Sequence, residues 1–332
     1  MTLVGVPHRD LLRVCLLSFG LAIILCFVSN NLNRRFQNRA DTVAQQFAIL
    51  EGRAYQVEGV EADWPPFRSR VLFPAALALV SRWKIVPPAA WFVILRLASA
   101  FFALLLFCLL LVRVAGVTPK IAAAGCVWLA LGMIPTFNHS WEHPTDFPDV
   151  IVYCTALWLA LRERKFALLL VTVVGSLNHQ TAAFAGVIWL CLYGLDSRRR
   201  PRPWQLAFGV LLMAVSKLAT SVVELLIRGE AGWDYVVNGY LSISQFLEFL
   251  QHPYASGWPV LLFAMLTPTA IWLWVNRKAL TATDARILAA VVLITAISSV
   301  IAFMAELRSV FLAPHVLAVF VAAAAEGRAG GD

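Results

Sequence analysis

Three aspartates stand where a long apolar segment of the chain begins or has just ended, and their carboxylates could do chemistry there. Asp41 follows the first apolar segment, and Asp146 and Asp149 lie three residues apart at the entry to a later one. A carboxylate can accept a proton as a general base, and two together can hold a divalent cation. The alternative is helix capping, in which Asp41 and Asp146 begin helices, with Pro148 in the first turn of the second. Both interpretations stay open from the sequence.

Arginine is the second residue type whose side chain could form a functional site, because its planar guanidinium binds phosphate through two parallel hydrogen bonds. Residues 30–88 hold eight cations against five acidic residues. These cations are Arg34, Arg35, Arg39, Arg53, Arg68, Arg70, Arg82 and Lys84. One interpretation is ion pairing and contact with lipid headgroups, and the other is a site for an anionic phosphate-bearing ligand. Arg96, inside an apolar segment, and Arg308, beside Glu306, pose the same choice between a carboxylate partner and a phosphate.

Polar residues near the ends of other apolar segments are candidate ligand contacts. Residues 139–143 spell H-x-x-E-H, a zinc-peptidase pattern, but prolines bracket this short segment. Because zinc would need both histidines on one helical face, we expect Glu142 and His143 to contact a substrate instead. Asn178 and His179 lie at a turn between two short apolar segments, where they either satisfy helix ends or contact a ligand.

The elements that position these residues are predicted to be membrane-spanning helices. Of 332 residues 60% are hydrophobic and 14% charged, with a mean hydropathy of +0.76, whereas soluble domains carry about 25% charged residues. Backbone groups in hydrocarbon must pair internally, so apolar stretches near the roughly 20 residues that cross a bilayer are helices. We expect an all-α, polytopic bundle that forms a single transmembrane domain, residues 1–332. Its ten apolar runs are 14–29, 89–112, 119–134, 149–161, 166–177, 181–195, 204–226, 258–275, 287–304 and 309–325.

Charge in the connecting loops predicts the orientation, because cytoplasmic loops are enriched in Lys and Arg. With both termini in the cytoplasm, the basic clusters at 162–165 and 198–202 face inward. The net charge of +8 then reflects arginines that flank membrane spans, not nucleic-acid binding. This orientation requires that 71–82, too short to cross, lies in the interface. The external loops are therefore 30–88, which holds interfacial helices, and 228–257.

Five short segments follow one another in an order that resembles a known family. They are Asp41 to Glu51-Gly52-Arg53, Pro65-Pro66-Phe67 with Arg70-Val71-Leu72-Phe73-Pro74, Arg96-Leu97-Ala98-Ser99-Ala100, Thr145-Asp146 with Pro148, and Glu306-Leu307-Arg308 with Pro314. This order resembles the GT-C glycosyltransferases, in the branch related to protein O-mannosyltransferases and aminoarabinose transferases. The family often has Asp-Glu where this chain has Asp41-Thr42, and a Lys-containing segment where this chain has Asn178-His179-Gln180-Thr181.

The resemblance implies a membrane glycosyltransferase that moves a hexose or pentose from a polyprenyl-phosphate donor to an envelope glycan, lipid or protein. The reaction would take place at the outer face of the cell membrane, in bacteria the inner membrane. Asp41 would be the base for the acceptor hydroxyl, and Asp146 a second catalytic residue and a candidate ligand for a divalent cation, Mg or Mn. Arg53, Arg70, Arg96 and Arg308 would bind the donor phosphate. Substrate contacts would come from Glu142, His143, Asn178, His179 and Glu306.

Two other functions use the same features. A transporter or flippase of a lipid-linked anionic substrate would recognise phosphate through the same arginines, but is expected to show paired repeats or helices broken at mid-membrane. A non-catalytic membrane partner protein is the third interpretation. In each case the lipid bilayer is a partner and nucleic acid is not.

Overall fold

A computed structural model of the chain describes residues 8–33, 39–52, 56–57, 60–61, 70–134, 145–195, 200–229, 258–301 and 307–330. Within these residues the fold is all-α, with twelve α-helices and one two-stranded hairpin. The prediction of an all-α chain is therefore confirmed. The hairpin pairs β1 (Gln56–Val57) with β2 (Val60–Glu61) in antiparallel register, Gln56 opposite Glu61, and was not predicted.

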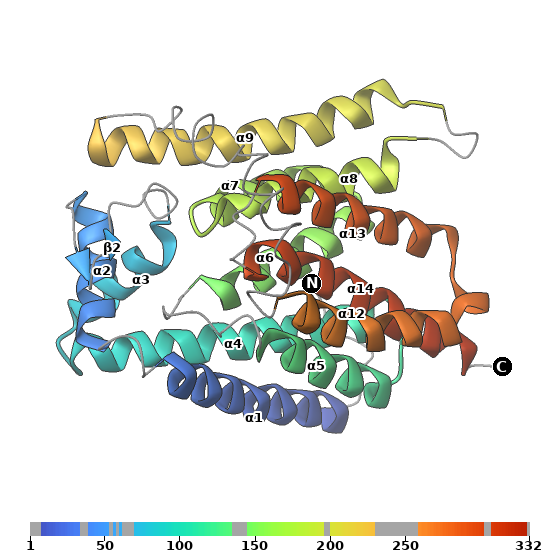
Figure 1. Ribbon diagram of the computed structural model, residues 1–332, viewed down its shortest axis with the longest axis horizontal. Helices are drawn as coiled ribbons and strands as arrows, with labels where there is room; N and C mark the ends of the chain where they lie inside the picture. The colour runs from blue at the N-terminus through green and yellow to red at the C-terminus, as the bar shows by residue number, and fades with distance from the viewer. Residues whose placement is uncertain are drawn as a thin grey trace.

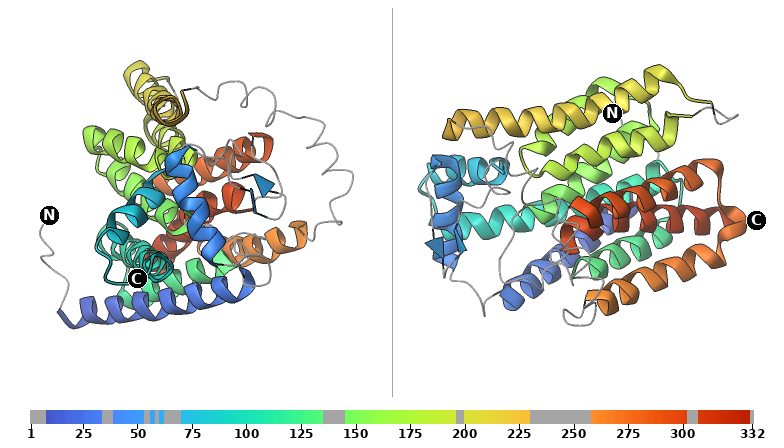
Figure 2. Two further views of the ribbon diagram at one scale, coloured as in Figure 1. Left: turned by 90° about the vertical axis from the view of Figure 1, so that its left-hand side faces the viewer. Right: turned by 45° about the horizontal axis from the view of Figure 1, so that its top comes forward.

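Ten of the helices form the body of the molecule. They are α1 (His8–Asn33), α4 (Pro88–Arg113), α5 (Pro119–Met133), α6 (Asp146–Leu161), α7 (Lys165–Ser176), α8 (Phe184–Tyr193), α9 (Pro203–Arg228), α12 (Trp258–Val275), α13 (Ala282–Ile301) and α14 (Leu307–Ala329). Figure 1 shows most of them running along the long axis, whereas the end view in Figure 2 shows α1 lying obliquely across the bundle. Short 3₁₀ turns, η3 (Gln180–Ala183) and η4 (Arg277–Ala279), lead into α8 and α13.

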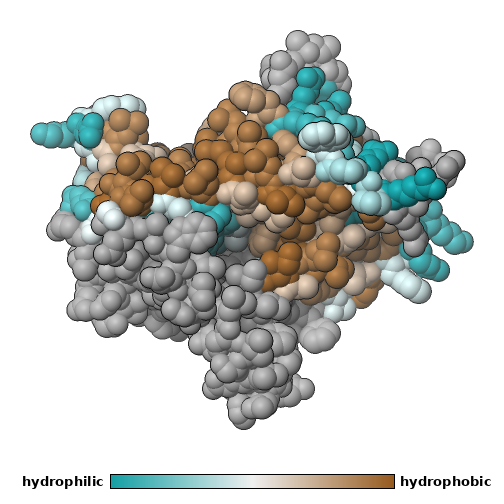
Figure 3. Space-filling view, turned by 90° about the horizontal axis from the view of Figure 1, so that it is seen from above, coloured by the Kyte–Doolittle hydropathy of each residue, from teal (hydrophilic) through white to brown (hydrophobic). Residues whose placement is uncertain are grey.

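Within the described residues, each of the ten apolar runs predicted from the sequence overlaps one of these helices. Three described helices are long and apolar enough to cross a membrane, namely Pro88–Arg113, Pro203–Ile227 and Phe311–Ala329. On the outer surface of α9, Leu218 and Leu226 are exposed, and Figure 3 shows apolar side chains gathered over this face. An apolar surface of this kind is what contact with lipid requires, so the chain is a membrane protein.

Proline and glycine set several helix ends. Pro88, Pro119 and Pro203 each stand in the first turn of their helix, where the missing N–H would have no intrahelical partner. Thr118 caps α5 by accepting a hydrogen bond from the Ile121 N–H. Gly229 ends α9 in the left-handed conformation at φ +74°, which costs glycine nothing.

Two short helices close one end of the bundle. Figures 1 and 2 show α2 (Arg39–Glu51) lying across this end beside α3 (Leu72–Ser81). Val43 of α2, Phe73 and Leu77 of α3 and Phe92 of α4 form a small separate core, in which the rings of Phe73 and Phe92 meet edge to face at 5.4 Å. With ten residues, α3 is about 15 Å long, too short to cross. A helix over 71–82 is therefore confirmed, whereas its place in the membrane interface stays a prediction.

The main core surrounds α14, which packs against α13, α12, α5, α6 and α4. Its buried stretch consists largely of Val and Ala, so neighbouring backbones approach closely. His315 is fully buried in this helix, stacked on Phe311, with Nε2 3.4 Å from the Trp128 carbonyl oxygen. The space that it fills exists because residue 132 on α5 has no side chain.

Gly132→Ala is expected to destabilise the protein by about 1–3 kcal/mol, the usual cost of overpacking. A methyl group at this position would overlap the His315 imidazole. Gly20→Ala is the matched control, because a methyl group on Gly20 in α1 would meet nothing within 4 Å. Melting temperatures in one detergent should fall for the first variant and stay level or rise for the second. Equal melting of both variants would show that the contact with His315 does not constrain the bundle.

Candidate functional site

One backbone hydrogen bond brings two distant segments together at the end of the bundle closed by α2 and α3. The Leu72 N–H at the start of α3 donates to the Leu177 carbonyl at the end of α7, at 2.9 Å. Arg70 therefore lies beside the turn that holds Asn178 and His179. The Arg70 side chain is only 3% exposed, and its charge acts electrostatically on both His179 and Asp149.

Asn178 joins this turn to the start of α6. Its Nδ2 donates to the Asp149 Oδ1 at 2.7 Å and to the Thr145 carbonyl at 3.0 Å. Asn178 is fully buried, and Asp146 and Asp149 are buried beside it. A buried carboxylate is costly unless hydrogen bonds and an opposite charge compensate it. At Asp149 the Asn178 amide donates a hydrogen bond, and the positive charge of Arg70 acts on the same carboxyl group.

His179 belongs to a second hydrogen-bond chain in the same place. The Tyr153 hydroxyl donates to Thr181 Oγ1 at 2.6 Å, and this oxygen lies 2.7 Å from His179 Nδ1. Nδ1 also accepts from the Thr181 N–H at 3.2 Å, so the neutral ring carries its proton on Nε2. Burial, and then the positive charge of Arg70, lower the pKa of His179 well below its usual range. His179 Nδ1 lies 3.9 Å from Asp149 Oδ2.

A second buried arginine lies near the start of α6. Arg96 on α4 is 3% exposed, and its guanidinium carbon lies 5.5 Å from the centre of the Phe147 ring. Phe147 directly follows Asp146, so Arg96 on α4 lies near the first turn of α6, and Arg70, two residues before α3, acts on Asp149 of the same turn. We call Arg70, Arg96, Asp146, Asp149, Asn178 and His179 the polar cluster.

The stability of the protein is expected to fall as the pH drops below about 6.5, the pKa of a histidine in an unfolded chain. In that range the unfolded chain takes up a proton at position 179 that the folded protein does not, since the pKa of buried His179 is lowered. Stability is lost until the pH reaches the folded pKa, at no more than about 1.4 kcal/mol per pH unit. His179→Asn removes this proton and keeps a residue that can cap η3. Melting at pH 7.5 and 5.5 should show a smaller drop in the variant, and equal drops would contradict the assignment.

The two helix-capping interpretations were wrong in detail. Thr145, not Asp146, occupies the N-cap position of α6, and Asp146 is the first helical residue. Asp41 is the third residue of α2, inside its first turn. Both carboxylates still face the positive end of a helix dipole, which stabilises them modestly. Asp41 is half-buried and lies on the helix that packs against α3, at the same end as the polar cluster.

Other predicted site residues lie outside the described part of the chain. They are Arg53, Glu142, His143 and Glu306. Arg308 falls in the first turn of α14, but its side chain is not among those described. Among the described residues, no three His, Cys, Asp or Glu side chains are arranged to hold a metal ion. The metal role of Asp146 stays a prediction.

The sequence did not single out Tyr153 and Thr181, and it gave Asp149 only a secondary place. Tyr153 lies four residues after Asp149, one helical turn along the same face of α6. This spacing is the signal that was available, because polar side chains one turn apart in an apolar helix line a common surface. Thr181 had no comparable signal, since it lies in a 3₁₀ turn.

Comparison with known proteins adds no relative. No protein-family model, no curated protein and no solved structure matches the chain. The resemblance to GT-C glycosyltransferases therefore depends on the order of the short motifs. Any function must be argued from the chemistry of the polar cluster and from its place at the end of a membrane-embedded bundle.

Proposed function

We propose that the protein is a membrane glycosyltransferase that takes its sugar from a polyprenyl-phosphate donor. One observation carries the proposal: two buried arginines, Arg70 and Arg96, lie near the first turn of α6, which carries two buried aspartates, at the end of the bundle closed by α2 and α3. Buried ionisable groups in a membrane protein are expensive and mark functional sites by default. Arginine is suited to phosphate, because the guanidinium is always charged and forms paired hydrogen bonds.

The aspartates of the polar cluster position the cations. Asp149 is held by the Asn178 amide and lies within the field of Arg70. Without such counter-charges, a buried guanidinium in an empty site would be strongly destabilising. With them, Arg70 is kept ready for an anion that arrives from the lipid phase. Arg96 is supported differently, by the face of the Phe147 ring.

The reaction needs one base and one stabilised leaving group. Asp41, at the same end and only half-buried, accepts the proton of the acceptor hydroxyl. The hydroxyl oxygen forms a bond to the anomeric carbon of the sugar as the bond from this carbon to the phosphate oxygen breaks. The leaving polyprenyl phosphate keeps the electron pair, and Arg70 and Arg96 balance its charge. The sugar is thus transferred to the acceptor oxygen, the proton is transferred to Asp41, and no redox change occurs.

The proposed orientation places the polar cluster at the outer face. The opposite end of the bundle carries Arg113 at the end of α4, Arg202 before α9 and Arg277 between α12 and α13. Lys and Arg in the short loops at that end support a cytoplasmic assignment, although residues 30–88 at the other end are also rich in arginine. All ten helices of the body would then cross the membrane, α8 together with η3 and the other short helices with their flanking turns, whereas α2 and α3 would lie in the outer interface.

The decisive experiment is sugar transfer by the purified protein in proteoliposomes. Polyprenyl-phosphate hexoses and pentoses with a radiolabelled sugar are supplied with an envelope extract as acceptor. The expected result is label in the acceptor fraction and release of free polyprenyl phosphate in equal amounts. Movement of the intact donor between leaflets, without release of polyprenyl phosphate, would replace the proposal with a flippase. Donor binding without either outcome would indicate a non-catalytic partner.

A further inference from the structure

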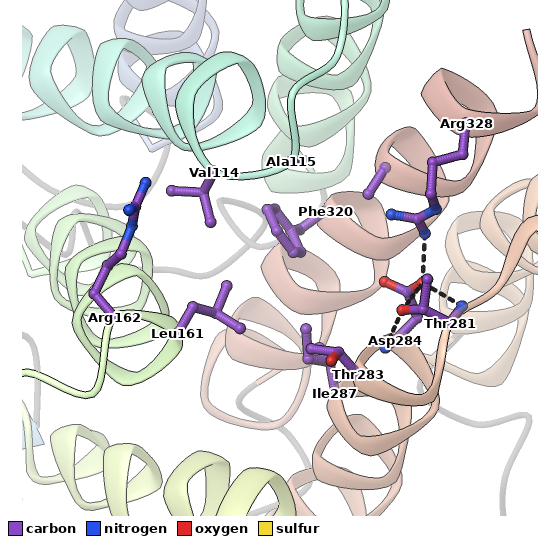
Figure 4. Close-up of a pocket in the computed structure, with 11 residues that line it drawn as sticks. Val114, Ala115, Leu161, Arg162, Thr281, Thr283, Asp284, Ile287, Phe320 and Arg328 are labelled. Atoms are coloured by element: carbon purple, nitrogen blue, oxygen red, sulfur yellow. Dashed lines mark hydrogen bonds and ion pairs between the residues drawn. The ribbon is translucent and has the colours of Figure 1, made fainter. Parts of the chain in front are cut away.

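A cavity of about 430 Å³ lies at the end of the bundle opposite the polar cluster. It opens where the last turns of α4, α6 and α14 meet the first turn of α13. Figure 4 shows Phe320 in the middle of its lining, with Arg162 on one side and Arg328 with Asp284 on the other. The volume lies within the range of sites that bind small molecules.

Arg328 is held in place by groups at the start of α13. Its Nε donates to the Ala279 carbonyl at 3.0 Å, and its Nη2 contacts Asp284 Oδ2. Asp284 also accepts from the Thr281 N–H and hydroxyl, both at 2.7 Å, and Thr281 accepts in return from the Asp284 N–H. This reciprocal cap fixes the arginine. Figure 4 shows its remaining terminal nitrogen turned toward the cavity.

The charges that line the cavity favour an anion. Arg162 and Arg328 contribute two positive charges against one negative charge from Asp284. That carboxylate is already occupied by Thr281 and Arg328, so it is a poor ligand for a cation. The first turn of α13, a helix of 20 residues, adds the positive end of its dipole. The Thr283 hydroxyl lines the same wall and can donate a hydrogen bond.

We propose that this cavity binds the phosphate of an anionic ligand, and that the ligand is the headgroup of an anionic phospholipid. The polar rim would take the phosphate, and the apolar wall formed by Leu161, Ile287 and Phe320 would take the glycerol and upper acyl carbons. Basic pockets between membrane helices at the cytoplasmic end are suited to such headgroups. Free phosphate presents the same anion without the apolar part. The site does not depend on the proposed transferase reaction.

The test is a titration of the purified protein in neutral detergent with dioctanoyl phosphatidylglycerol, followed by the melting temperature. Parallel titrations use dioctanoyl phosphatidylcholine and inorganic phosphate. We expect saturable stabilisation by phosphatidylglycerol only. Equal stabilisation by phosphatidylcholine would overturn the site. Stabilisation by inorganic phosphate at similar concentrations would keep the phosphate site but overturn the lipid as its source.

Two variants connect the effect to the cavity. Arg162→Gln removes a lining cation that is exposed and does not hold the fold, so the apparent Kd for phosphatidylglycerol should rise about fivefold. Arg164→Gln is the matched control. Arg164 is also an exposed arginine and lies two residues after Arg162, but it does not line the cavity. An unchanged Kd in Arg162→Gln, or an equal rise in both variants, would overturn the proposal.

Discussion

Asp41→Asn is expected to slow sugar transfer by about 10²- to 10⁴-fold, the usual effect of losing a general base. Asparagine keeps the shape of the side chain in the first turn of α2 and removes its negative charge, and with it the capacity to accept a proton. The Asp41 side chain is half-buried, whereas Asp146 and Asp149 are buried. An acceptor hydroxyl can therefore reach Asp41 from outside the bundle. The measurement is transfer of labelled sugar from polyprenyl phosphate under single-turnover conditions.

A purely structural role for Asp41 predicts a different result. A carboxylate in the first turn of a helix contributes about 0.3–1 kcal/mol through the helix dipole, so the variant would melt slightly earlier and turn over almost normally. Glu51→Gln is the matched control, since Glu51 is the exposed last residue of the same helix. Turnover of Asp41→Asn within a few-fold of the wild type would remove Asp41 from the mechanism. Asp146 would then be the next carboxylate to test.

The fold class could be predicted because it depends on one strong physical constraint. Backbone groups in lipid must pair within a helix, so apolar runs translate directly into helices. Helix ends were harder, because they depend on local geometry. The residue type of Asp146 predicted an N-cap, but the N-cap position of α6 lies one residue earlier, at Thr145. The hairpin at 56–61 escaped prediction because two-residue strands carry too little pattern to detect.

The residues of the candidate site could be predicted from the sequence, but the contacts that bring them together could not. Arg70, Asp146, Asn178 and His179 were each singled out as charged or polar residues near the ends of apolar segments. Their convergence depends on the backbone hydrogen bond between Leu72 and Leu177. Both of these residues are leucines, so no side-chain signal marks that bond. The cavity near Arg328 was missed for a similar reason, since its lining comes from the ends of four helices far apart in the chain.

Arg70→Ala is expected to lower the free energy of unfolding by about 3–5 kcal/mol, the cost of leaving a buried charge without its partner. The charge of Arg70 acts on both Asp149 and His179 at the closed end of the bundle. The same change should abolish donor binding. Arg82→Ala is the matched control, because Arg82 is exposed just after α3 and should change stability by no more than about 0.5 kcal/mol.

A protein that fails to fold cannot report on binding, so a second variant separates the two effects. Arg70→Gln combined with Asp149→Asn removes the charge of Arg70 and any charge on Asp149, and leaves an amide oxygen at position 149 that can still accept a hydrogen bond from Asn178. Replacing two buried polar groups of opposite charge together by neutral ones is often tolerated, whereas removing only one of them is not. The double variant should therefore recover most of the stability that Arg70→Ala loses. If Arg70 binds the donor phosphate, the double variant should be folded and still fail to bind polyprenyl phosphate in a titration that saturates the wild type. Normal binding would show that Arg70 serves only to neutralise Asp149, and the phosphate role would pass to Arg96.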